Sequence, residues 1–377
     1  MVQKHRFFLI DKMKRLTLIL KPTVLCNCAC RYCITPTDIP KSRMGIDLFE
    51  RFCNKLSEST IYDQFVFIWH GGEPLLMGIP FYEQVIEIQK RLFRGKIFIN
   101  TFQSNCTLIN DEWMAFFKKY RIRVSTSLDG DKELHDINRI KNGKGTFEET
   151  LERIKWLQDE HLLAGVVTVL SRTNLEHVDR ILKYFSENNI CTRLNPILPS
   201  ERVVESDVDM SITPEQYADC LINCYDKWVA GEYKYNGRNI GIAPLNEVIY
   251  NFFNEKRPRL CNFSGDCSSS FLAINPEGDL YNCGRFCDID EFKIANVDDE
   301  FENIDSIFER KRDLIKWGKD SSECDSCEWL KVCNRGCPNT SYLTYGEILD
   351  KDPYCVAYKK LFRHIYEHLS VSIPQNE

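Results

Sequence analysis

Three cysteines close to the N-terminus have the spacing of an iron–sulfur ligand set. Cys26, Cys30 and Cys33 form a C-x3-C-x2-C run that directly follows an apolar segment predicted to be a β-strand. Three thiolates on one tight loop can bind three irons of a [4Fe–4S] cluster and leave the fourth iron open to a chelating ligand. The alternative is a zinc site, which would need a fourth protein ligand such as Cys28. We interpret Cys28 instead as a small buried hydrophobic residue.

A second cysteine group lies near the C-terminus, where nine of the eighteen cysteines fall between Cys261 and Cys355. Eight of these nine are Cys261, Cys267, Cys283, Cys324, Cys327, Cys333, Cys337 and Cys355. Eight thiolates are enough for two fully ligated [4Fe–4S] clusters, whereas a zinc ribbon would need only four. The cysteines outside both groups are most simply packing residues. Among them Cys287 is the candidate for a functional role, because it lies close in sequence to Cys283.

The composition indicates a soluble two-domain protein that stays inside the cell. Of its 377 residues 43% are hydrophobic and 28% charged, enough to bury a sizeable core. The net charge of −6 argues against a nucleic-acid or anionic-membrane surface. No apolar run approaches the roughly 18 residues of a membrane span, and Asp11 and Lys12 end the N-terminal apolar stretch too early for a signal peptide. We expect a cytoplasmic protein whose cysteines bind metal rather than form disulfides.

Short apolar runs alternate with amphipathic stretches between residues 15 and 200. The predicted strands are Leu16–Leu20, Phe65–Trp69, Ile97–Thr101, Arg123–Ser127, Gly165–Leu170 and Cys191–Pro196. The predicted helices are Ile46–Leu56, Phe81–Leu92, Asp111–Lys119, Phe147–Gln158, Leu175–Phe185 and, leaving the barrel, Pro214–Trp228. This alternation predicts an α/β fold, a partial (β/α)6 TIM-type barrel, with its chemistry at the C-terminal strand ends.

The cysteine-rich segment is predicted to be a second domain. After about residue 258 the strands become short, with a hairpin expected at Asn275–Gly278, and Lys256–Pro258 interrupts the pattern. We divide the chain into a barrel over residues 1–235, a bridging helical segment over 236–257, and a cysteine-rich domain with a C-terminal helix over 258–377. The tail from Pro374 is expected to be frayed.

With its neighbours, the first cysteine run resembles the hallmark of the radical S-adenosylmethionine (SAM) enzymes, in which an aromatic residue precedes the last cysteine. Three further segments match that family in the family's order, each at the end of a predicted strand. The residues that carry the match, and that we expect to bind the cofactor, are Tyr32, Gly71, Gly72, Glu73, Pro74, Gln103, Asn105, Ser127, Asp129 and Arg139. Singly, each could be a turn or a solvated charge, but the ordered set argues against coincidence.

The resemblance implies SAM binding and radical chemistry. The two glycines would let backbone carbonyls and Glu73 approach the SAM ammonium group, which a Cβ atom would hinder. Ser127 and Arg139 would bind the SAM carboxylate, for which a guanidinium is a suitable bidentate donor. A reduced cluster would split SAM into methionine and a 5′-deoxyadenosyl radical, which takes a hydrogen atom from an unactivated substrate carbon.

The order of the C-terminal cysteines resembles the SPASM domain, the auxiliary-cluster extension of radical SAM enzymes that modify peptides and proteins. The resemblance assigns one auxiliary cluster to Cys261, Cys267, Cys283 and Cys337 and the other to Cys324, Cys327, Cys333 and Cys355. It thus implies three [4Fe–4S] clusters, one at SAM and two auxiliary. Because the two ligand sets interleave along the chain, we expect this domain not to fold without iron.

Two peptide reactions compete for this layout. The length, the cysteine spacing and the His70–Pro74 segment resemble the anaerobic sulfatase-maturating enzymes, which convert Ser or Cys to formylglycine. In those enzymes an Asp directly after the hairpin cysteine is the base, whereas this chain has Gly284, which cannot accept a proton. The segments Cys283–Phe286 and Lys21–Cys26 resemble instead maturases of ribosomally made peptides that form cyclophane cross-links. We favour such a cross-link, formed with loss of two hydrogens, with an auxiliary cluster as the electron acceptor.

These motifs do not identify the catalytic residues. The candidates are Arg285, Asp288 and His70. The candidates to line the substrate pocket are His70, Trp69, Arg193, Asn195 and Arg285, with a structural role as the alternative for each. Epimerisation or thioether formation stays open, since a fold does not determine which hydrogen is taken. The non-enzyme alternative is an iron–sulfur or zinc scaffold, in which a cluster with an open iron would serve little purpose.

The expected partners are a peptide or protein substrate and, from the family, a flavodoxin or ferredoxin as electron donor. Only 25 residues precede Cys26, which leaves no room there for a leader-binding domain. A leader peptide would then be bound by the barrel and SPASM surfaces or by a separate partner, unless the substrate has none. We expect no nucleic-acid or membrane partner.

Overall fold

The computed structural model describes residues 14–35, 41–204, 209–254, 259–265, 267–301, 303–308, 322–348 and 351–372. The interruption predicted at residues 256–258 and the tail from Pro374 lie outside these ranges. The division into domains stays a prediction.

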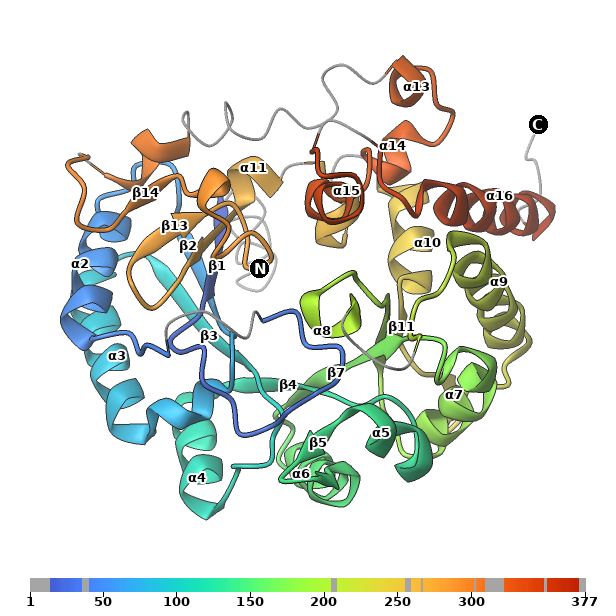
Figure 1. The fold of residues 1–377 in the computed structure, drawn as a ribbon, viewed down its shortest axis with the longest axis horizontal. Helices are drawn as coiled ribbons and strands as arrows, with labels where there is room; N and C mark the ends of the chain where they lie inside the picture. Colours follow the sequence, from blue (N-terminus) through green and yellow to red (C-terminus); the bar gives the residue numbers. More distant parts are fainter. Residues whose placement is uncertain are drawn as a thin grey trace, which may run out of the picture.

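Six parallel strands form the centre of the fold, as the alternating pattern predicts. They are β1 (Arg15–Leu20), β2 (Gln64–Trp69), β3 (Ile97–Gln103), β4 (Arg123–Ser127), β7 (Leu163–Leu170) and β8 (Thr192–Pro196). Each of them pairs in parallel with the next along the chain. The sheet curves into an open barrel with helices on its outside (Figure 1), which confirms the predicted fold class.

The helices that follow these strands cover the outer face. They are α2 (Ile46–Ser57), α3 (Ile79–Leu92), α4 (Asp111–Tyr120), α6 (Phe147–Asp159), α7 (Val178–Glu187) and α9 (Pro214–Ala230). Their bounds lie close to the predicted ones, except that a 3-10 turn, η2 (Leu175–His177), precedes α7. Side chains that cap the backbone determine where two of them begin: Asn110 accepts from Trp113 N at α4, and Thr213 accepts from Gln216 N at α9.

The C-terminal segment continues the same sheet. β12 (Phe271–Ile274) pairs in parallel with β1, and β13 (Asp279–Tyr281) and β14 (Ala295–Asn296) follow it in antiparallel order. The turn between β12 and β13 is the predicted hairpin. At the other edge β11 (Ile242–Ala243) pairs with β8. The sheet therefore runs across the predicted division into domains, which strands this short could not reveal by periodicity.

Side-chain alternation along β2 builds the main core outside the barrel. Phe65, Phe67 and Trp69 are completely buried, and Phe49 of α2 lies 6.2 Å from Phe67 and 5.5 Å from Trp69 between ring centroids. The residues between them face the barrel interior and are only partly buried. Trp69 therefore belongs to the core rather than to the substrate pocket.

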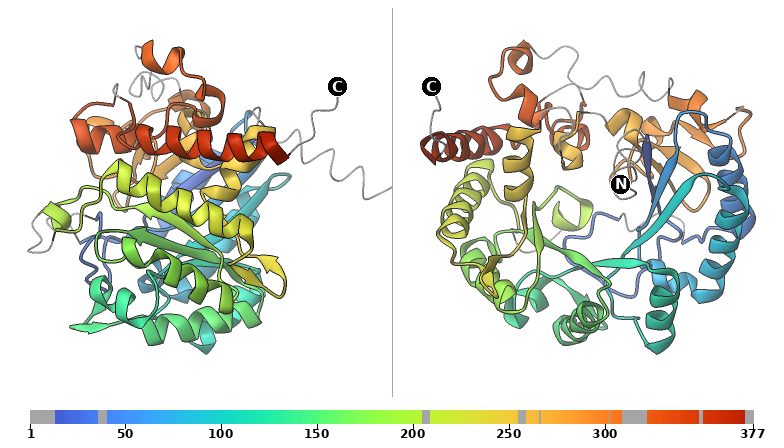
Figure 2. Two further views of the ribbon diagram at one scale, coloured as in Figure 1. Left: turned by 90° about the vertical axis from the view of Figure 1, so that its right-hand side faces the viewer. Right: turned by 180° about the vertical axis from the view of Figure 1, so that it is seen from behind.

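Most of the remaining elements are short, and the longest of them is α16. They include η1 (Pro74–Met77), α5 (Lys132–Asn138), β5 (Ile140–Lys141), β6 (Lys144–Gly145), α8 (Glu201–Val204), β9 (Lys234–Tyr235), β10 (Arg238–Asn239), α10 (Leu245–Phe253), η3 (Cys261–Phe263), α11 (Cys267–Ser270), η4 (Asp290–Phe292), η5 (Ile304–Ser306), α13 (Ser322–Asp325), α14 (Leu330–Cys333), α15 (Pro338–Tyr345) and α16 (Cys355–Ser372). Helix α16 packs along α9 (Figure 2). The ring centroids of Tyr225 in α9 and His364 in α16 lie 5.7 Å apart. Among the described helices, none has the length and apolar character to cross a membrane.

Candidate active site

The segment after β2 holds the cysteine loop through its backbone. Gly72 N donates to Thr23 O at 3.0 Å and Glu73 N donates to Leu25 O at 2.7 Å. A Cβ atom on Gly72 would lie only 2.1 Å from Leu25 O. Gly71 has a φ of 113°, where a side chain would be strained. Glycines are therefore needed here, and the neighbour that Gly72 must clear is the cysteine loop itself.

The other side of the cysteine loop is held by the chain after α5. Ala29 N donates to Ile140 O at 2.7 Å and Arg31 N donates to Asn138 O at 3.0 Å. The loop is thus fixed from two directions by backbone hydrogen bonds. These bonds determine the path of the backbone that carries the cysteines.

Polar donors surround the sulfurs of this loop. Asn105 Nδ2 lies 3.8 Å from Cys26 Sγ, and Arg139 Nη1 lies 4.0 Å from Cys30 Sγ. The side-chain hydrogen bond with Cys28 lowers the pKa of the Cys26 thiol to about 6 and so favours the thiolate, which is the form that binds metal. Electrostatic interactions connect Cys30 to both Cys26 and Cys33. This donor set fits a [4Fe–4S] cluster, whose sulfurs accept such hydrogen bonds.

Glu73 connects the ends of β2 and β3. It is only 1% exposed; its Oε1 accepts from Leu75 N at 3.1 Å and Ser104 Oγ at 2.8 Å, and its Oε2 accepts from Asn105 N at 2.8 Å. Burial raises the pKa of Glu73 to about 7. Both oxygens are therefore committed within the protein, and the contact of Glu73 with the SAM ammonium group stays a prediction.

Asp129 positions Arg139. Its Oδ2 accepts from Arg139 Nε at 2.8 Å and from the hydroxyl of Tyr32, and its Oδ1 accepts from Val169 N at 3.0 Å. The Arg139 guanidinium also lies 5.2 Å from the centre of the Tyr32 ring. Because Asp129 binds only Nε, the terminal nitrogens of Arg139 are left to face the cysteine loop. This arrangement suits the predicted role of Arg139 in binding a carboxylate.

The other residues of the predicted SAM set lie at the same end of the barrel. Gln103 and Ser127 are the last residues of β3 and β4, and Pro74 begins η1. Their contacts with SAM stay predictions.

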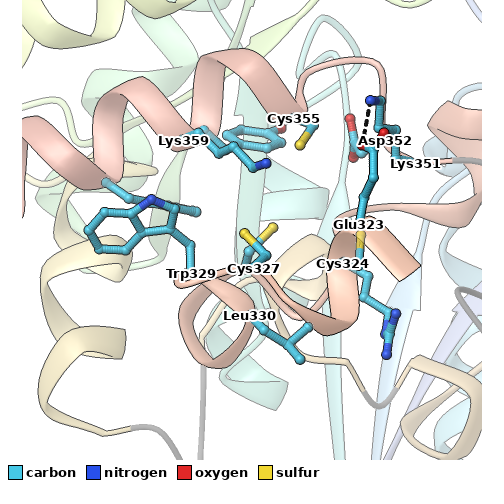
Figure 3. Close-up of a pocket in the computed structure, with 13 residues that line it drawn as sticks. Glu323, Cys324, Cys327, Trp329, Leu330, Lys351, Asp352, Cys355 and Lys359 are labelled. Carbon is cyan, nitrogen blue, oxygen red and sulfur yellow. Dashed lines mark hydrogen bonds and ion pairs between the residues drawn. The ribbon is translucent and has the colours of Figure 1, made fainter. Parts of the chain in front are cut away.

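Four cysteines near the C-terminus, which we call group two, line one hollow. They are Cys324, Cys327, Cys333 and Cys355. Figure 3 shows residues that line this hollow, which has a volume of about 460 Å³ and is open to solvent. Lys351 and Lys359 lie on its rim, and Lys351 Nζ pairs with Glu323 at 2.7 Å. Group two is the set that the SPASM resemblance assigns to one cluster.

The other four cysteines, which we call group one, are linked by electrostatic interactions. They are Cys261, Cys267, Cys283 and Cys337. Asn282 Nδ2 lies 3.8 Å from Cys267 Sγ, a donor suited to a cluster sulfur. The chain thus brings together both predicted sets of four, although their segments interleave. Within the described residues, no three His, Cys, Asp or Glu side chains are placed to hold a single metal ion.

Asp352 lies between the two groups and was not singled out from the sequence. Its carboxylate is 2% exposed and accepts from Cys337 N at 2.8 Å and Tyr354 N at 2.9 Å. Electrostatic interactions connect it to Cys333 of group two as well. Burial raises the pKa of Asp352 to about 6. A lone Asp in a loop carries no motif, so only the contacts reveal this position.

The three candidate catalytic residues share one neighbourhood with Lys21, which the sequence analysis did not assign. Lys21 Nζ pairs with Asp288 Oδ2 at 3.1 Å, and Asn275 Nδ2 donates to Asp288 Oδ1 at 3.2 Å. Burial, with the charges of Lys21 and Arg285, lowers the pKa of His70 to about 4. His70 is therefore neutral near pH 7. Both oxygens of Asp288 are occupied.

The position after the hairpin cysteine is tightly packed. A Cβ atom on Gly284 would lie 2.7 Å from Cγ2 of Ile19 in β1. A contact that short forces the isoleucine to move. A side chain at this position would therefore strain the contact between the hairpin and β1.

His135 is a further residue whose role comes only from its contacts. It is completely buried, its Nδ1 accepts from Asp129 N at 3.3 Å, and its Nε2 lies 3.0 Å from Thr146 Oγ1. Burial lowers the pKa of His135 to about 4. The neutral imidazole thus holds the backbone of the aspartate that positions Arg139.

Comparisons with known proteins agree with this geometry. The family model described as the Radical SAM superfamily matches residues 20–185. An uncharacterized protein of Synechocystis sp. is 36% identical over 87% of this chain and 85% of its own length. A serine-type anaerobic sulfatase-maturating enzyme of Bacteroides thetaiotaomicron is 27% identical over 94% of this chain and 91% of its own. The solved structure of native anSMEcpe with bound AdoMet superposes with a TM-score of 0.83 at 25% identity, covering 95% of this chain and 98% of that one.

Proposed function

The chain belongs to the radical SAM superfamily, and we propose that it is a peptide maturase that forms a carbon–carbon cross-link of the cyclophane type with loss of two hydrogens. Its cofactors are SAM and three [4Fe–4S] clusters, one that binds SAM and two auxiliary. The observation that carries the choice of reaction is Gly284, which has no side chain to act as the base that formylglycine formation uses in the sulfatase maturases, and which packs tightly against Ile19.

A different set of cysteines would hold each of the three clusters. Cys26, Cys30 and Cys33 would hold the SAM-binding cluster, and groups one and two the auxiliary clusters. Bound there, the cluster and SAM supply the radical that takes a hydrogen atom from the peptide. Arg139, held by Asp129, would bind the SAM carboxylate. Gly72 would keep the cysteine loop close to the end of β2.

None of the three candidate catalytic residues is a free base. Asp288 is paired with Lys21, and Arg285 is a cation. His70 Nδ1 accepts from Gly71 N at 2.6 Å, which assigns the proton of the neutral ring to Nε2 and makes it a hydrogen-bond donor. A cross-link does not require a base that deprotonates a substrate hydroxyl or thiol beforehand, because the bond forms at carbon. This neighbourhood therefore supports cross-linking over formylglycine formation.

The second candidate is formylglycine formation, which is favoured by the extent of the match to the sulfatase-maturating enzyme of Bacteroides thetaiotaomicron. It would need a base from elsewhere in the chain. Epimerisation and thioether formation are further outcomes of the same hydrogen abstraction. We further propose that a separate partner binds the leader peptide and that a flavodoxin or ferredoxin donates the electrons.

The test uses the purified protein with its clusters reconstituted under anaerobic conditions. A synthetic sulfatase peptide containing the target Ser or Cys is incubated with SAM and dithionite, and an aldehyde-reactive hydrazide reports formylglycine. We expect no aldehyde from the wild type. Aldehyde formation by the wild type would overturn the proposal and establish the second candidate, while Cys30→Ala, which should lose SAM cleavage, is the blank.

A further inference from the structure

A second hollow lies between the barrel and group one. It has about 590 Å³, is open to solvent, and is walled by β8, by residues 260–262 and by three tyrosines. The tyrosines, Tyr217, Tyr354 and Tyr358, present their rings, because their hydroxyls bond to Leu194 O, Ile197 O and the Asn262 amide respectively. Cys261 and Cys337 of group one also line it. A ligand in this hollow would therefore lie beside an auxiliary cluster.

Three side chains of this hollow that can donate hydrogen bonds have no described partner. Arg193 and Asn195 of β8 and Arg285 after β13 line it, and none of the three side chains forms a hydrogen bond or ion pair with a described residue. No Asp or Glu is among the lining residues. The nearby carboxylate of Asp352 is already occupied by Cys337 N and Tyr354 N. Two guanidinium groups and one amide thus share a hollow that has no carboxylate among its lining residues.

The two arginines differ in what surrounds them. Arg285 lines the hollow beside Cys261 and Cys337 of group one, whose sulfurs interact with its charge. Arg193 is exposed and pairs with none of the residues that the structure describes, so its charge is the one left for a ligand.

We infer that this hollow binds a carboxylate group of the peptide substrate, with Arg193 as the principal ligand and Asn195 as a second donor. The inference rests on the proposed function, since it names the chemistry of that peptide. A guanidinium is the side chain best suited to a carboxylate, which it can bind through two parallel hydrogen bonds. The carboxylate belongs either to an Asp or Glu side chain or to the peptide C-terminus. Bound there, it would anchor the peptide between the SAM site and group one.

The experiment measures binding by fluorescence anisotropy on the reconstituted protein with SAM and without reductant, so that no turnover occurs. The probes are three short peptides with an uncharged label, identical except at one position and at the C-terminus. The first has Asp and an amidated C-terminus, the second Asn and an amidated C-terminus, and the third Asn and a free C-terminus. We expect at least one carboxylate peptide to bind about tenfold more tightly than the Asn amide. The Asp amide and the free-acid peptide separate the two sources.

The variants connect this preference to the hollow. Arg193→Gln should remove the preference and Arg193→Lys should keep part of it. Arg94→Gln, in the turn before β3 at the opposite end of the barrel, should leave it unchanged. Iron content must match in all four proteins. Equal affinities, no measurable binding of any peptide, or a preference that survives Arg193→Gln would each overturn the inference. A cross-linked product without charge-dependent binding would refute this inference alone, whereas charge-dependent binding with no cross-linked product would refute the proposed function alone.

Discussion

The two iron–sulfur regions of the molecule are built in opposite ways. The loop from Cys26 to Cys33 places the three predicted ligands within eight residues, and backbone hydrogen bonds from the ends of β2 and α5 hold it. Groups one and two instead combine residues from Cys261 to Cys355, and Cys337 of group one lies between Cys333 and Cys355 of group two along the chain. The first site is prepared by the chain, whereas the second depends on segments that meet only when the protein is folded.

Because of this difference, we expect loss of metal to affect the two regions differently. The apolar core around Phe67 and Trp69, to which β12, β13 and β14 also contribute, needs no metal. Apart from α16, the segments that carry groups one and two are short helices and turns with few strands between them. We therefore expect the clusters to contribute to stability mainly in the C-terminal half.

The largest expected effect is the loss of the cysteine loop's iron. Replacing Cys26, Cys30 or Cys33 by Ala should abolish SAM cleavage and reduce the iron content by about one third, because one cluster of three would be lost. The measurements are 5′-deoxyadenosine release and total iron. Cys191→Ala, which removes an exposed cysteine outside all three sets, should leave both unchanged. Normal SAM cleavage by a loop variant would show that the cluster is elsewhere.

Almost as large an effect should follow from adding one methyl group behind the loop. Gly72→Ala would place Cβ 2.1 Å from Leu25 O, so the cysteine loop must move. We expect SAM cleavage to fall by about 100-fold or more, since small misplacements at a reacting centre have effects of this size. Gly45→Ala is the matched control, because nothing lies within 4 Å of a Cβ there. Equal activity of the two variants would show that a glycine at position 72 is not needed to keep the cysteine loop in place.

Removing a ligand of group two should affect the opposite half of the molecule. Cys355→Ala should reduce hydrogen-exchange protection over residues 322–372 and leave the barrel strands protected. The physical reason is that group two would join α13, α14 and α16 through metal, in addition to the apolar contacts between α14 and α16. Hydrogen exchange read by mass spectrometry gives both regions in one experiment. Loss of protection throughout the barrel would show that the two halves fold as one unit.

A smaller effect is expected at the hairpin. Gly284→Ala should destabilise the protein by about 1–3 kcal/mol, because its Cβ must displace the Cγ2 methyl group of Ile19. The double variant Gly284→Ala with Ile19→Ala should recover part of this loss relative to Ile19→Ala alone, since Ala lacks the Cγ2 methyl group that the new Cβ meets. Thermal unfolding of the reconstituted proteins measures both. No recovery in the double variant would show that the strain arises from another contact.

The smallest effect is a pH dependence that belongs to His135. Burial lowers its pKa to about 4 in the folded state from 6.5, so the unfolded chain binds more protons as pH falls below 6.5. The folded protein should therefore lose about 2 kcal/mol between pH 7 and pH 5 from this group. His135→Gln should show a shallower decrease in melting temperature over that range. A parallel decrease in both proteins would mean that His135 does not titrate as its burial requires.

The sequence predicted the local features of the molecule better than the distant ones. The strands of the barrel follow from apolar runs, and the cysteine loop follows from spacing within eight residues. The pairing of β12 with β1, the tight packing of position 284 against Ile19 and the ion pair of Lys21 with Asp288 all join residues more than 200 positions apart. No periodicity records such contacts, so they could be learned only from the fold.

Cross-linking is best tested by the mass and fragmentation of a short peptide encoded beside this gene, after anaerobic co-expression with the protein. We expect a loss of two hydrogens per modified site, fragmentation blocked between the two joined residues, and no reaction with an aldehyde reagent. The same loss of mass at a single Ser or Cys, with aldehyde reactivity and unblocked fragmentation, would contradict it.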